Sequence, residues 1–359
     1  MNNNLLKASL VFIFIVIVSG LGIRFYLTKL NPIEEKPADA QIKTPSDPLM
    51  IEVMRKTQYP GSQIIIEQTL TPGSNYRQYI VSYLSDGLKI YALMTVPEKQ
   101  AKPKNGWPAS NALHSNAGWP VIIFNHGYIP PTQYRTTERY IAYVDALARS
   151  GYIILKPDYR GNGNSQGQPD GAYYSPAYAT DVLNALFSIK KYPEADPNKI
   201  GMWGHSMGGN IVLRDIVVDT KDIKAAVIWG GVVGSYNDLI NNWQRRVTYQ
   251  PPPNELALRN RHRTSLTKEH GTPADNPTFW QSIDPTYFLK EITTPIQLHT
   301  GGSDEEVPVA FSQSLEEKLK SAGKTVEYYD YPGGDHNISS PNFELAMQRT
   351  IQFFDKYLK

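Results

Sequence analysis

Short runs of apolar residues alternate along this chain with longer segments in which apolar positions recur at helical spacing. Three β-like runs cover residues 64–66, 78–84 and 88–96, and Asp86-Gly87 lies between the last two. An Asp-Gly pair between two such runs is a strong signal of a tight hairpin. From residue 120 onward, apolar runs and helix-like stretches alternate, which is typical of a parallel sheet covered by helices. The pattern predicts one α/β domain over residues 61–359, whose sheet opens with antiparallel strands.

Candidate strands and helices can be placed in the second part of the chain. The strands cover residues 121–125, 152–156, 225–229, 296–300 and 325–331, and the helices cover residues 136–150, 177–191 and 341–359. Residues 232–293 interrupt the alternation. Connections of this length are usually functional, so we expect this insertion to form a cap over an active site.

A Gly-x-Ser-x-Gly pentapeptide lies where an apolar run meets the helical segment that follows it. Residues 200–203 form the run, Ser206 follows, and residues 211–213 continue as a helix. Gly204 and Gly208 permit the sharp turn and the close packing of a nucleophile elbow. Ser206 is therefore the candidate nucleophile, with its hydroxyl above one end of the sheet.

A serine hydroxyl needs a histidine base and an orienting carboxylate to attack at neutral pH. After a nucleophile elbow, the acid and then the histidine are expected further along the chain. His336 is the candidate base, because it follows the strand-like run 325–331 and the loop 332–335. Asp304 is the candidate acid, because it lies in the loop after the strand-like run 295–300. The competing acids are Glu305, Glu306 and Asp335.

Attack on a carbonyl carbon builds negative charge on its oxygen, and preorganised backbone N–H groups usually stabilise that charge. One donor is expected from Met207, the residue after the nucleophile. The second is expected from Tyr128, because the run 121–125 and the His126-Gly127 turn place it directly after an earlier strand. These two N–H groups are the predicted oxyanion hole.

Five motifs resemble the catalytic domain of the prolyl-oligopeptidase family and its dienelactone-hydrolase-like relatives in the α/β-hydrolase superfamily. They are Asn-His-Gly-Tyr at 125–128, Asp-Tyr-Arg-Gly-Asn-Gly-Asn-Ser at 158–165, Asp-Pro-Asn-Lys-Ile-Gly-Met-Trp-Gly-His-Ser-Met-Gly-Gly at 196–209, Gly-Ser-Asp-Glu-Glu-Val-Pro at 302–308 and Gly-Gly-Asp-His at 333–336. The resemblance implies an α/β-hydrolase fold with helices on both faces of a mostly parallel sheet, and a Ser206, Asp304 and His336 triad. Prolyl oligopeptidases carry a long β-propeller before this domain, and this chain leaves no room for one. A carboxylesterase is therefore the alternative to a peptidase.

Composition narrows the function classes. The 36 Lys and Arg residues nearly balance the 34 Asp and Glu residues, which gives no sign of a nucleic-acid partner. The chain has no Cys, so disulfides, thiolate metal sites and a lipid-modified cysteine are excluded. No His or carboxylate pair has metal-ligand spacing on one element, and the expected chemistry needs no metal and no cofactor.

The N-terminal residues 1–30 carry a second signal. Residues 8–23 are uncharged and mostly apolar, which is slightly short of a full membrane span and longer than a signal-peptide core needs. We expect an uncleaved single-pass membrane anchor with the catalytic domain outside the cytoplasm; cleavage near residues 19–22, followed by secretion, is the alternative. Residues 31–60 mix prolines with charges and show no apolar period, which predicts a linker.

Substrate contacts are expected from the 232–293 insertion. Its aromatic residues Tyr236 and Trp243 are candidate pocket residues, with ordinary cap core as the alternative. The sequence thus predicts a serine hydrolase that cleaves a small ester or a peptide through an acyl-enzyme. A hypothesis of another class is a catalytically inactive, membrane-tethered binding module. The sequence carries no signal of the oligomeric state.

Overall fold

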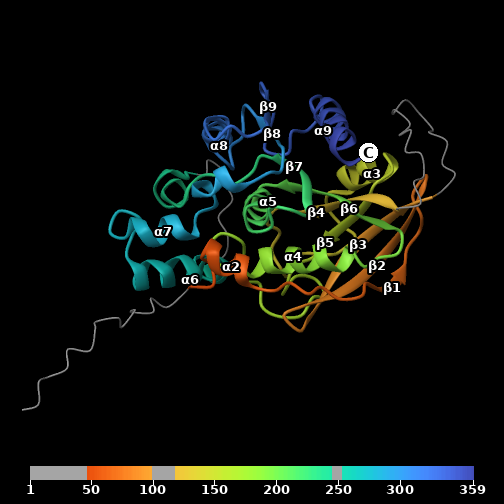
Figure 1. The fold of residues 1–359 in the computed structure, drawn as a ribbon, viewed down its shortest axis with the longest axis horizontal. Coiled ribbons are helices and arrows are strands. Elements are labelled where there is room, and N and C mark those ends of the chain that lie inside the picture. Colours follow the sequence, from red (N-terminus) through yellow and green to blue (C-terminus); the bar gives the residue numbers. More distant parts are fainter. Residues whose placement is uncertain (1–46, 99–117, 245–252) are drawn as a thin grey trace, which may run out of the picture. The chain divides into compact units, whose positions relative to one another are not determined.

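The computed structural model describes residues 47–98, 118–244 and 253–359, and nine strands within these ranges form one sheet (Figure 1). The strands are β1 (Ile65–Thr69), β2 (Tyr76–Ser85), β3 (Leu88–Pro97), β4 (Trp119–Asn125), β5 (Ile153–Pro157), β6 (Ala195–His205), β7 (Ile223–Trp229), β8 (Ile296–Gly301) and β9 (Val326–Tyr331). The α-helices are α2 (Ile51–Lys56), α3 (Ile141–Arg149), α4 (Ala177–Ile189), α5 (Met207–Val218), α6 (Pro253–His270), α7 (Pro277–Ile283), α8 (Val309–Ser321) and α9 (Phe343–Leu358). Three shorter helical turns are η1 (Asp238–Asn242), η2 (Pro285–Tyr287) and η3 (Leu289–Glu291).

The sheet is antiparallel at one end and parallel over the rest. Its strand order is β1-β2-β3-β5-β4-β6-β7-β8-β9. The pairs β1–β2, β2–β3 and β3–β5 are antiparallel, and every later neighbouring pair is parallel. The β2–β3 hairpin turns at Asp86 and Gly87, both with positive φ, of 50° and 77°, as a type I′ turn requires. The predicted α/β fold with antiparallel opening strands is confirmed.

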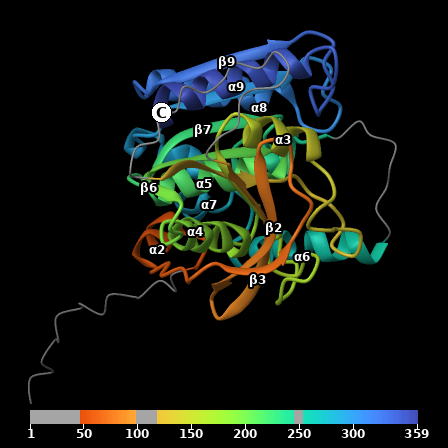
Figure 2. The same cartoon turned by 90° about the vertical axis from the view of Figure 1, so that its right-hand side faces the viewer.

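Helices cover both faces of the sheet, and β4 shows how its sequence allows this. Val121 and Ile123 belong to the apolar core that α4 and α5 share, whereas Ile122 and Phe124 belong to the core that α3 and α9 share. Alternate residues of a strand point to opposite faces, so a strand covered on both faces is continuously apolar. Figure 2 shows β2 and β3 at one end of the sheet and β9 at the other.

The parallel strands place four chain segments at one edge of the sheet. The carboxyl ends of β4, β6, β8 and β9 face the same way because the strands are parallel. The loops after these strands carry Tyr128, Ser206, Asp304 and His336. In open α/β sheets, ligands bind at this carboxyl edge, so the fold brings the predicted site residues to the expected place.

The 232–293 insertion contains η1, α6, α7, η2 and η3. Several of its described apolar residues, among them Tyr236, Phe279 and Trp280, form a separate cluster. The cluster is tied to α5 by the buried Arg214, which donates to the carbonyls of Leu49 and Ile283 at 3.2 and 3.0 Å and to the Tyr236 hydroxyl at 2.9 Å. The insertion is thus fixed to the helix that follows Ser206, and its role as a cap stays a prediction.

The segment before β1 differs from the linker expected over residues 31–60. Residues 51–56 form α2, and Leu49, Ile51 and Met54 are buried. A helix of six residues with two buried positions is too short to show an apolar period in the sequence. The expected membrane segment at 1–30 and the first part of the linker lie outside the described residues. Within the described ranges, no helix has both the length and the apolar character to cross a membrane.

Candidate active site

Ser206 lies at a sharp turn between β6 and α5. Its φ of 55° and ψ of −118° are rare for a residue with a side chain and persist only where surrounding contacts enforce them. The Ser206 N–H donates to the carbonyl of Trp229, and its carbonyl accepts from the N–H of Val232, both at 3.0 Å. A Cβ on Gly208 would lie 1.9 Å from the carbonyl oxygen of Asn125, so only glycine fits there. The strand-turn-helix geometry predicted around Ser206 is present.

The side chains of Asp304 and His336 meet at the ends of β8 and β9. Nδ1 of His336 lies 2.8 Å from Oδ2 of Asp304. The other oxygen, Oδ1, accepts from the N–H groups of Glu306 and Val307 at 2.8 and 2.9 Å. Three donors therefore hold this fully buried carboxylate. A neutral His336 ring then carries its proton on Nδ1, which leaves Nε2 as a proton acceptor.

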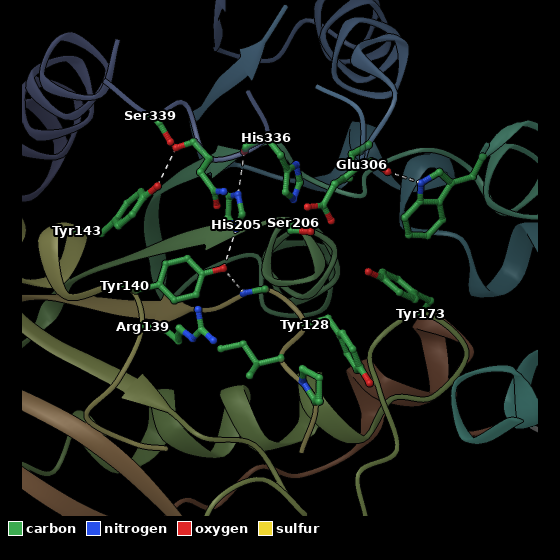
Figure 3. A pocket seen from close by; sticks show the side chains of 16 residues that line it. Tyr128, Arg139, Tyr140, Tyr143, Tyr173, His205, Ser206, Glu306, His336 and Ser339 are labelled. Atoms are coloured by element: carbon green, nitrogen blue, oxygen red, sulfur yellow. Dashed lines mark hydrogen bonds between the residues drawn. The ribbon is translucent and has the colours of Figure 1, made fainter. Parts of the chain in front are cut away.

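Ser206 and His336 line one cavity of about 570 Å³. In Figure 3, His336 lies next to Ser206, with Tyr140 and Tyr143 on one side of the cavity and Tyr173 on the other. Nε2 of His336 is buried and has no hydrogen-bond partner in the described part of the chain. A proton-accepting nitrogen and a hydroxyl thus border the same space, as general-base activation of a nucleophile requires.

Both expected oxyanion donors flank Ser206. Met207 is the first residue of α5, and the first N–H of a helix has no acceptor within that helix. Tyr128 lines the cavity, and a Cβ on the preceding Gly127 would lie 3.2 Å from Cβ of Ser206. The loop after β4 therefore runs directly beside the elbow. This arrangement suits two N–H donors to one developing oxyanion.

A chain of hydrogen bonds through Tyr140 joins the three loops of the site. The Tyr140 hydroxyl accepts from the Gly127 N–H at 2.9 Å and lies 2.7 Å from Nδ1 of His205. Nε2 of His205 lies 3.0 Å from the carbonyl oxygen of His336. A carbonyl only accepts, so Nε2 carries the proton, and Tyr140 donates to Nδ1. Burial lowers the pKa of His205 to about 3, which keeps this ring neutral.

The loop that carries Tyr140 is held by the buried Asp158 at the end of β5. Oδ1 of Asp158 accepts from the Tyr134 hydroxyl at 2.8 Å, and Oδ2 accepts from the Thr136 hydroxyl at 2.6 Å. Burial raises the pKa of this carboxyl to about 6, although both hydroxyls oppose the rise. Asp158 therefore fixes this loop through Tyr134 and Thr136.

A second cavity of about 200 Å³ adjoins the first. The two share Tyr128, Tyr173 and Trp243, and the second continues over Met207 and Tyr178. Trp243, a predicted pocket residue, therefore lines both spaces, and its Nε1 donates to the Glu306 carbonyl at 2.8 Å.

Tyr236, the other predicted pocket residue, lines neither cavity. It is buried in the cluster of the insertion, 4% exposed, and its hydroxyl bonds to Arg214 and to the carbonyl of Tyr173. This placement agrees with the alternative of ordinary cap core, because the Tyr236 hydroxyl satisfies the buried guanidinium of Arg214. An aromatic residue in an insertion gives no sequence signal that separates these two roles.

Several cavity residues have no signal in the sequence. Arg139, Tyr140, Tyr143 and Tyr173 line the first cavity, and the first two lie inside the helix predicted at 136–150. The helix begins at Ile141, because Arg139 and Tyr140 adopt positive φ of 59° and 55°. Of the competing acids, Glu306 lines the cavity and Asp335 accepts from the Ser339 N–H at 2.7 Å.

An elbow serine, a buried Asp–His pair and a cavity at the carboxyl edge of a mostly parallel sheet are features of serine hydrolases with the α/β-hydrolase fold, and this chain is a serine hydrolase of that fold. Residues 139–359 match the prolyl oligopeptidase family, and the chain belongs to this family. The family resemblance inferred from the motifs is confirmed.

Individual relatives are distant, and they differ in length. The chain is 25% identical over 266 residues to the uncharacterized peptidase YtmA of Bacillus subtilis, covering 74% of this chain and 88% of YtmA. It shares the fold of dipeptidyl peptidase 4 from Porphyromonas gingivalis, with a TM-score of 0.58, 18% identity, and coverage of 79% of this chain but 36% of that protein. It also shares the fold of an acetyl xylan esterase from Paenibacillus sp. R4, with a TM-score of 0.60, 19% identity and coverage of 86% and 92%.

Proposed function

We propose that this protein hydrolyses an ester or peptide bond through a covalent acyl-enzyme on Ser206. The observation that carries the proposal is the 2.8 Å contact between His336 Nδ1 and Asp304 Oδ2, with Nε2 of His336 left unpartnered among the described residues beside the cavity that holds Ser206. This contact supports a base that is oriented by Asp304 and open to the nucleophile.

In the proposed acylation, Oγ of Ser206 bonds to the substrate carbonyl carbon while its proton passes to Nε2 of His336. The N–H groups of Met207 and Tyr128 stabilise the oxyanion that forms. The bond to the leaving oxygen or nitrogen then breaks, and His336 returns the proton to that atom. Water repeats these steps on the acyl-enzyme, with His336 again as the base, and releases the acid product.

The reaction is proposed first as peptide hydrolysis, on the basis of family membership. A carboxylesterase is the second candidate, because the aromatic walls of the second cavity suit an acyl group that has no peptide backbone. Both candidates use the same residues and differ in the leaving atom.

Fluorophosphonate labelling of the full chain tests the proposal, with Ser206→Ala as the matched control. We expect the wild type to be labelled on Ser206 and the variant to stay unlabelled, and the ratio of p-nitrophenyl ester to aminoacyl anilide turnover chooses between the two candidates. A folded wild-type protein that is not labelled would contradict the proposal and favour a binding role.

We also propose that residues 1–30 anchor the protein in a membrane, with the catalytic domain outside the cytoplasm. The support is the apolar run at residues 8–23. Fractionation of expressing cells, with and without residues 1–30, tests this: we expect the full chain in the membrane fraction and the shortened chain in the soluble fraction. The proposal would be contradicted if the full chain were found in the soluble fraction with residues 1–30 still attached.

A further inference from the structure

The active-site cavity is chemically different on its two sides. On one side of Ser206 lie the aromatic residues Tyr173 and Trp243, which lead into the second cavity. On the other side, Figure 3 shows Arg139 beside Tyr140 and Tyr143. Asn337 and Ser339, which follow His336 in the chain, also line this first cavity. The site therefore has an aromatic arm, whose further lining includes Asp170, Asn260 and Arg263, and a second arm that carries Arg139.

Arg139 is the cation of this second arm. Its side chain is exposed and lines the cavity, and it forms no hydrogen bond or ion pair with any residue that the structure describes. The acidic residue among the lining residues, Glu306, lies across Ser206 from Arg139 in Figure 3. A guanidinium that faces a cavity and forms no ion pair with a described carboxylate is available to a ligand, and its planar fork matches a carboxylate.

The backbone at Arg139 is constrained to this orientation. Arg139 and Tyr140 are consecutive non-glycine residues with positive φ, of 59° and 55°, a backbone conformation that is unfavourable for residues with a side chain. The turn is held at both ends, by the hydrogen bonds of Tyr140 to Gly127 and His205 and by those of Asp158 to Tyr134 and Thr136. Strained backbone that is held in this way is a common feature of functional sites.

The proposed chemistry assigns the arm that carries Arg139 to the leaving group. His336 must return a proton to the leaving atom, so the leaving group passes beside His336 and the residues that follow it. The acyl part then extends past Tyr128 and Met207, the proposed oxyanion donors, toward the aromatic walls of the second cavity. A charged group on the leaving side would meet Arg139.

We propose that Arg139 recognises a carboxylate on the leaving group, so that the preferred substrates join an apolar acyl group to a leaving group with a free carboxylate. Examples are a peptide cleaved close to its C-terminus and an ester of a hydroxy acid. This inference rests on the proposed function, because it assigns the leaving-group side from the role of His336.

Matched substrates test the inference. One pair consists of phenylacetyl esters of 3-hydroxybenzoate and of its neutral analogue 3-hydroxybenzamide; a second series consists of acylated peptides ending in one, two or three glycines, each as the free acid and as the amide. In the wild type we expect kcat/KM to be roughly 10- to 100-fold higher for the carboxylate member of a pair, as for a charge-assisted hydrogen bond. The preference should shrink as salt is raised, because Arg139 is exposed.

Three variants of Arg139 and one control complete the test. The quantity compared is the ratio of kcat/KM for the carboxylate and the neutral member of a pair. Arg139→Ala should bring this ratio to about one, and Arg139→Lys should leave it above one but below the wild-type value. Arg139→Glu should bring it below one. The control is Arg135→Ala: Arg135 is also exposed, donates to the carbonyls of Thr132 and Tyr134, and does not line the cavity, so its ratio should match the wild type. A wild-type ratio near one, or a preference that survives in Arg139→Ala, would overturn the inference.

A binding measurement separates this inference from the proposed function. Ser206→Ala, which cannot form an acyl-enzyme, is titrated with 3-hydroxybenzoate and with 3-hydroxybenzamide while tryptophan fluorescence is followed. Tighter binding of the carboxylate, lost on adding Arg139→Ala, supports the inference even if the wild type is not labelled by the fluorophosphonate. Equal affinities overturn it even if labelling succeeds.

Discussion

The Tyr140 hydroxyl lies 2.7 Å from Nδ1 of His205, the residue immediately before Ser206. The same hydroxyl accepts from the Gly127 N–H, next to the proposed oxyanion donor Tyr128, and His205 contacts the carbonyl of His336. One phenol therefore connects the loop after β4, the elbow and the loop after β9. Tyr140 is a positioning residue, since it acts on the site through these neighbours.

We predict that Tyr140→Phe lowers kcat about 10-fold or more, because the Gly127 N–H and Nδ1 of His205 both lose their partner. Leaving a buried polar group without a partner costs about 1–3 kcal/mol, so the free energy of unfolding of the variant should also be lower. The measurements are kcat and the rate of fluorophosphonate labelling, at a temperature where the variant is fully folded. Tyr143→Phe is the matched control, because its hydroxyl contacts only the carbonyl of Asn337 among described residues, at 2.7 Å. A Tyr140→Phe variant that is less stable but is labelled at the wild-type rate would assign Tyr140 a purely structural role.

We predict that Asp304→Asn lowers kcat roughly 10³- to 10⁴-fold, as the loss of the orienting carboxylate does in serine proteases. The amide keeps the size of the side chain but removes the charge that stabilises protonated His336. Steady-state kinetics on the better p-nitrophenyl ester is the measurement. Glu305→Gln removes a charge from the exposed neighbouring residue and should leave kcat within about twofold. A loss in Asp304→Asn of less than tenfold would assign the acid role elsewhere.

We predict that Gly208→Ala disrupts the elbow. The added Cβ would lie 1.9 Å from the Asn125 carbonyl oxygen, so β4 or α5 must move, at a cost of roughly 3 kcal/mol. Denaturant unfolding and labelling of the folded fraction measure the two effects. Gly323→Ala provides the comparison, since its Cβ would meet nothing within 4 Å and only its φ of +70° is unfavourable, which costs about 1–2 kcal/mol. If the two variants lost equal free energy of unfolding and equal labelling, the close contact at Gly208 would not be what requires glycine in the elbow.

We predict a pH-dependent stability from Asp158. Burial raises its pKa from 3.8 to about 6 in the folded protein, so between about pH 4 and pH 6 the folded chain holds a proton that the unfolded chain has released. The free energy of unfolding therefore falls as the pH rises through this window, by about 3 kcal/mol for a shift of about two pKa units.

Asp158→Asn removes this ionisation and tests the prediction. The free energy of unfolding is measured in urea from pH 4 to pH 7. From pH 4 to about pH 6, that of the wild type should fall relative to that of the variant, and above pH 6 the difference between the two should stay constant. If the free energies of unfolding of the wild type and the variant run parallel over the whole pH range, Asp158 has an ordinary pKa in the folded protein.

Much of the fold could be predicted because its signals are local. The hairpin at Asp86 and Gly87, the apolar run of β4 and the glycines around Ser206 each depend on neighbouring residues. The position of β5 between β3 and β4 has no local signal, because it is set by which strands pair after the chain has crossed the sheet.

The residues of the site also fall into those that have a local sequence signal and those that have none. The sequence places Ser206, Asp304 and His336 at the ends of strands that meet, and the structure brings Asp304 and His336 into contact; their catalytic roles remain proposals. Arg139 and Tyr140 could not be found, because the left-handed turn that they form is held by bonds from Tyr140 to Gly127 and His205, which no local pattern indicates. The aromatic character of Tyr236 and its place in the insertion suit both a pocket and cap core, and its bond to Arg214 lies in the cluster of the insertion.

The hydrogen bonds that join the three loops end on main-chain groups, the N–H of Gly127 and the carbonyl of His336. Any residue has a backbone carbonyl and any residue except proline has an N–H, so these bonds do not depend on the side chains next to them. Asn337 and, with proline left out so that the proposed oxyanion N–H is kept, Tyr128 can therefore be varied in a library while the loops keep their register. Directed evolution of new substrate preferences should begin at these two positions, with Tyr140 and His205 left unchanged.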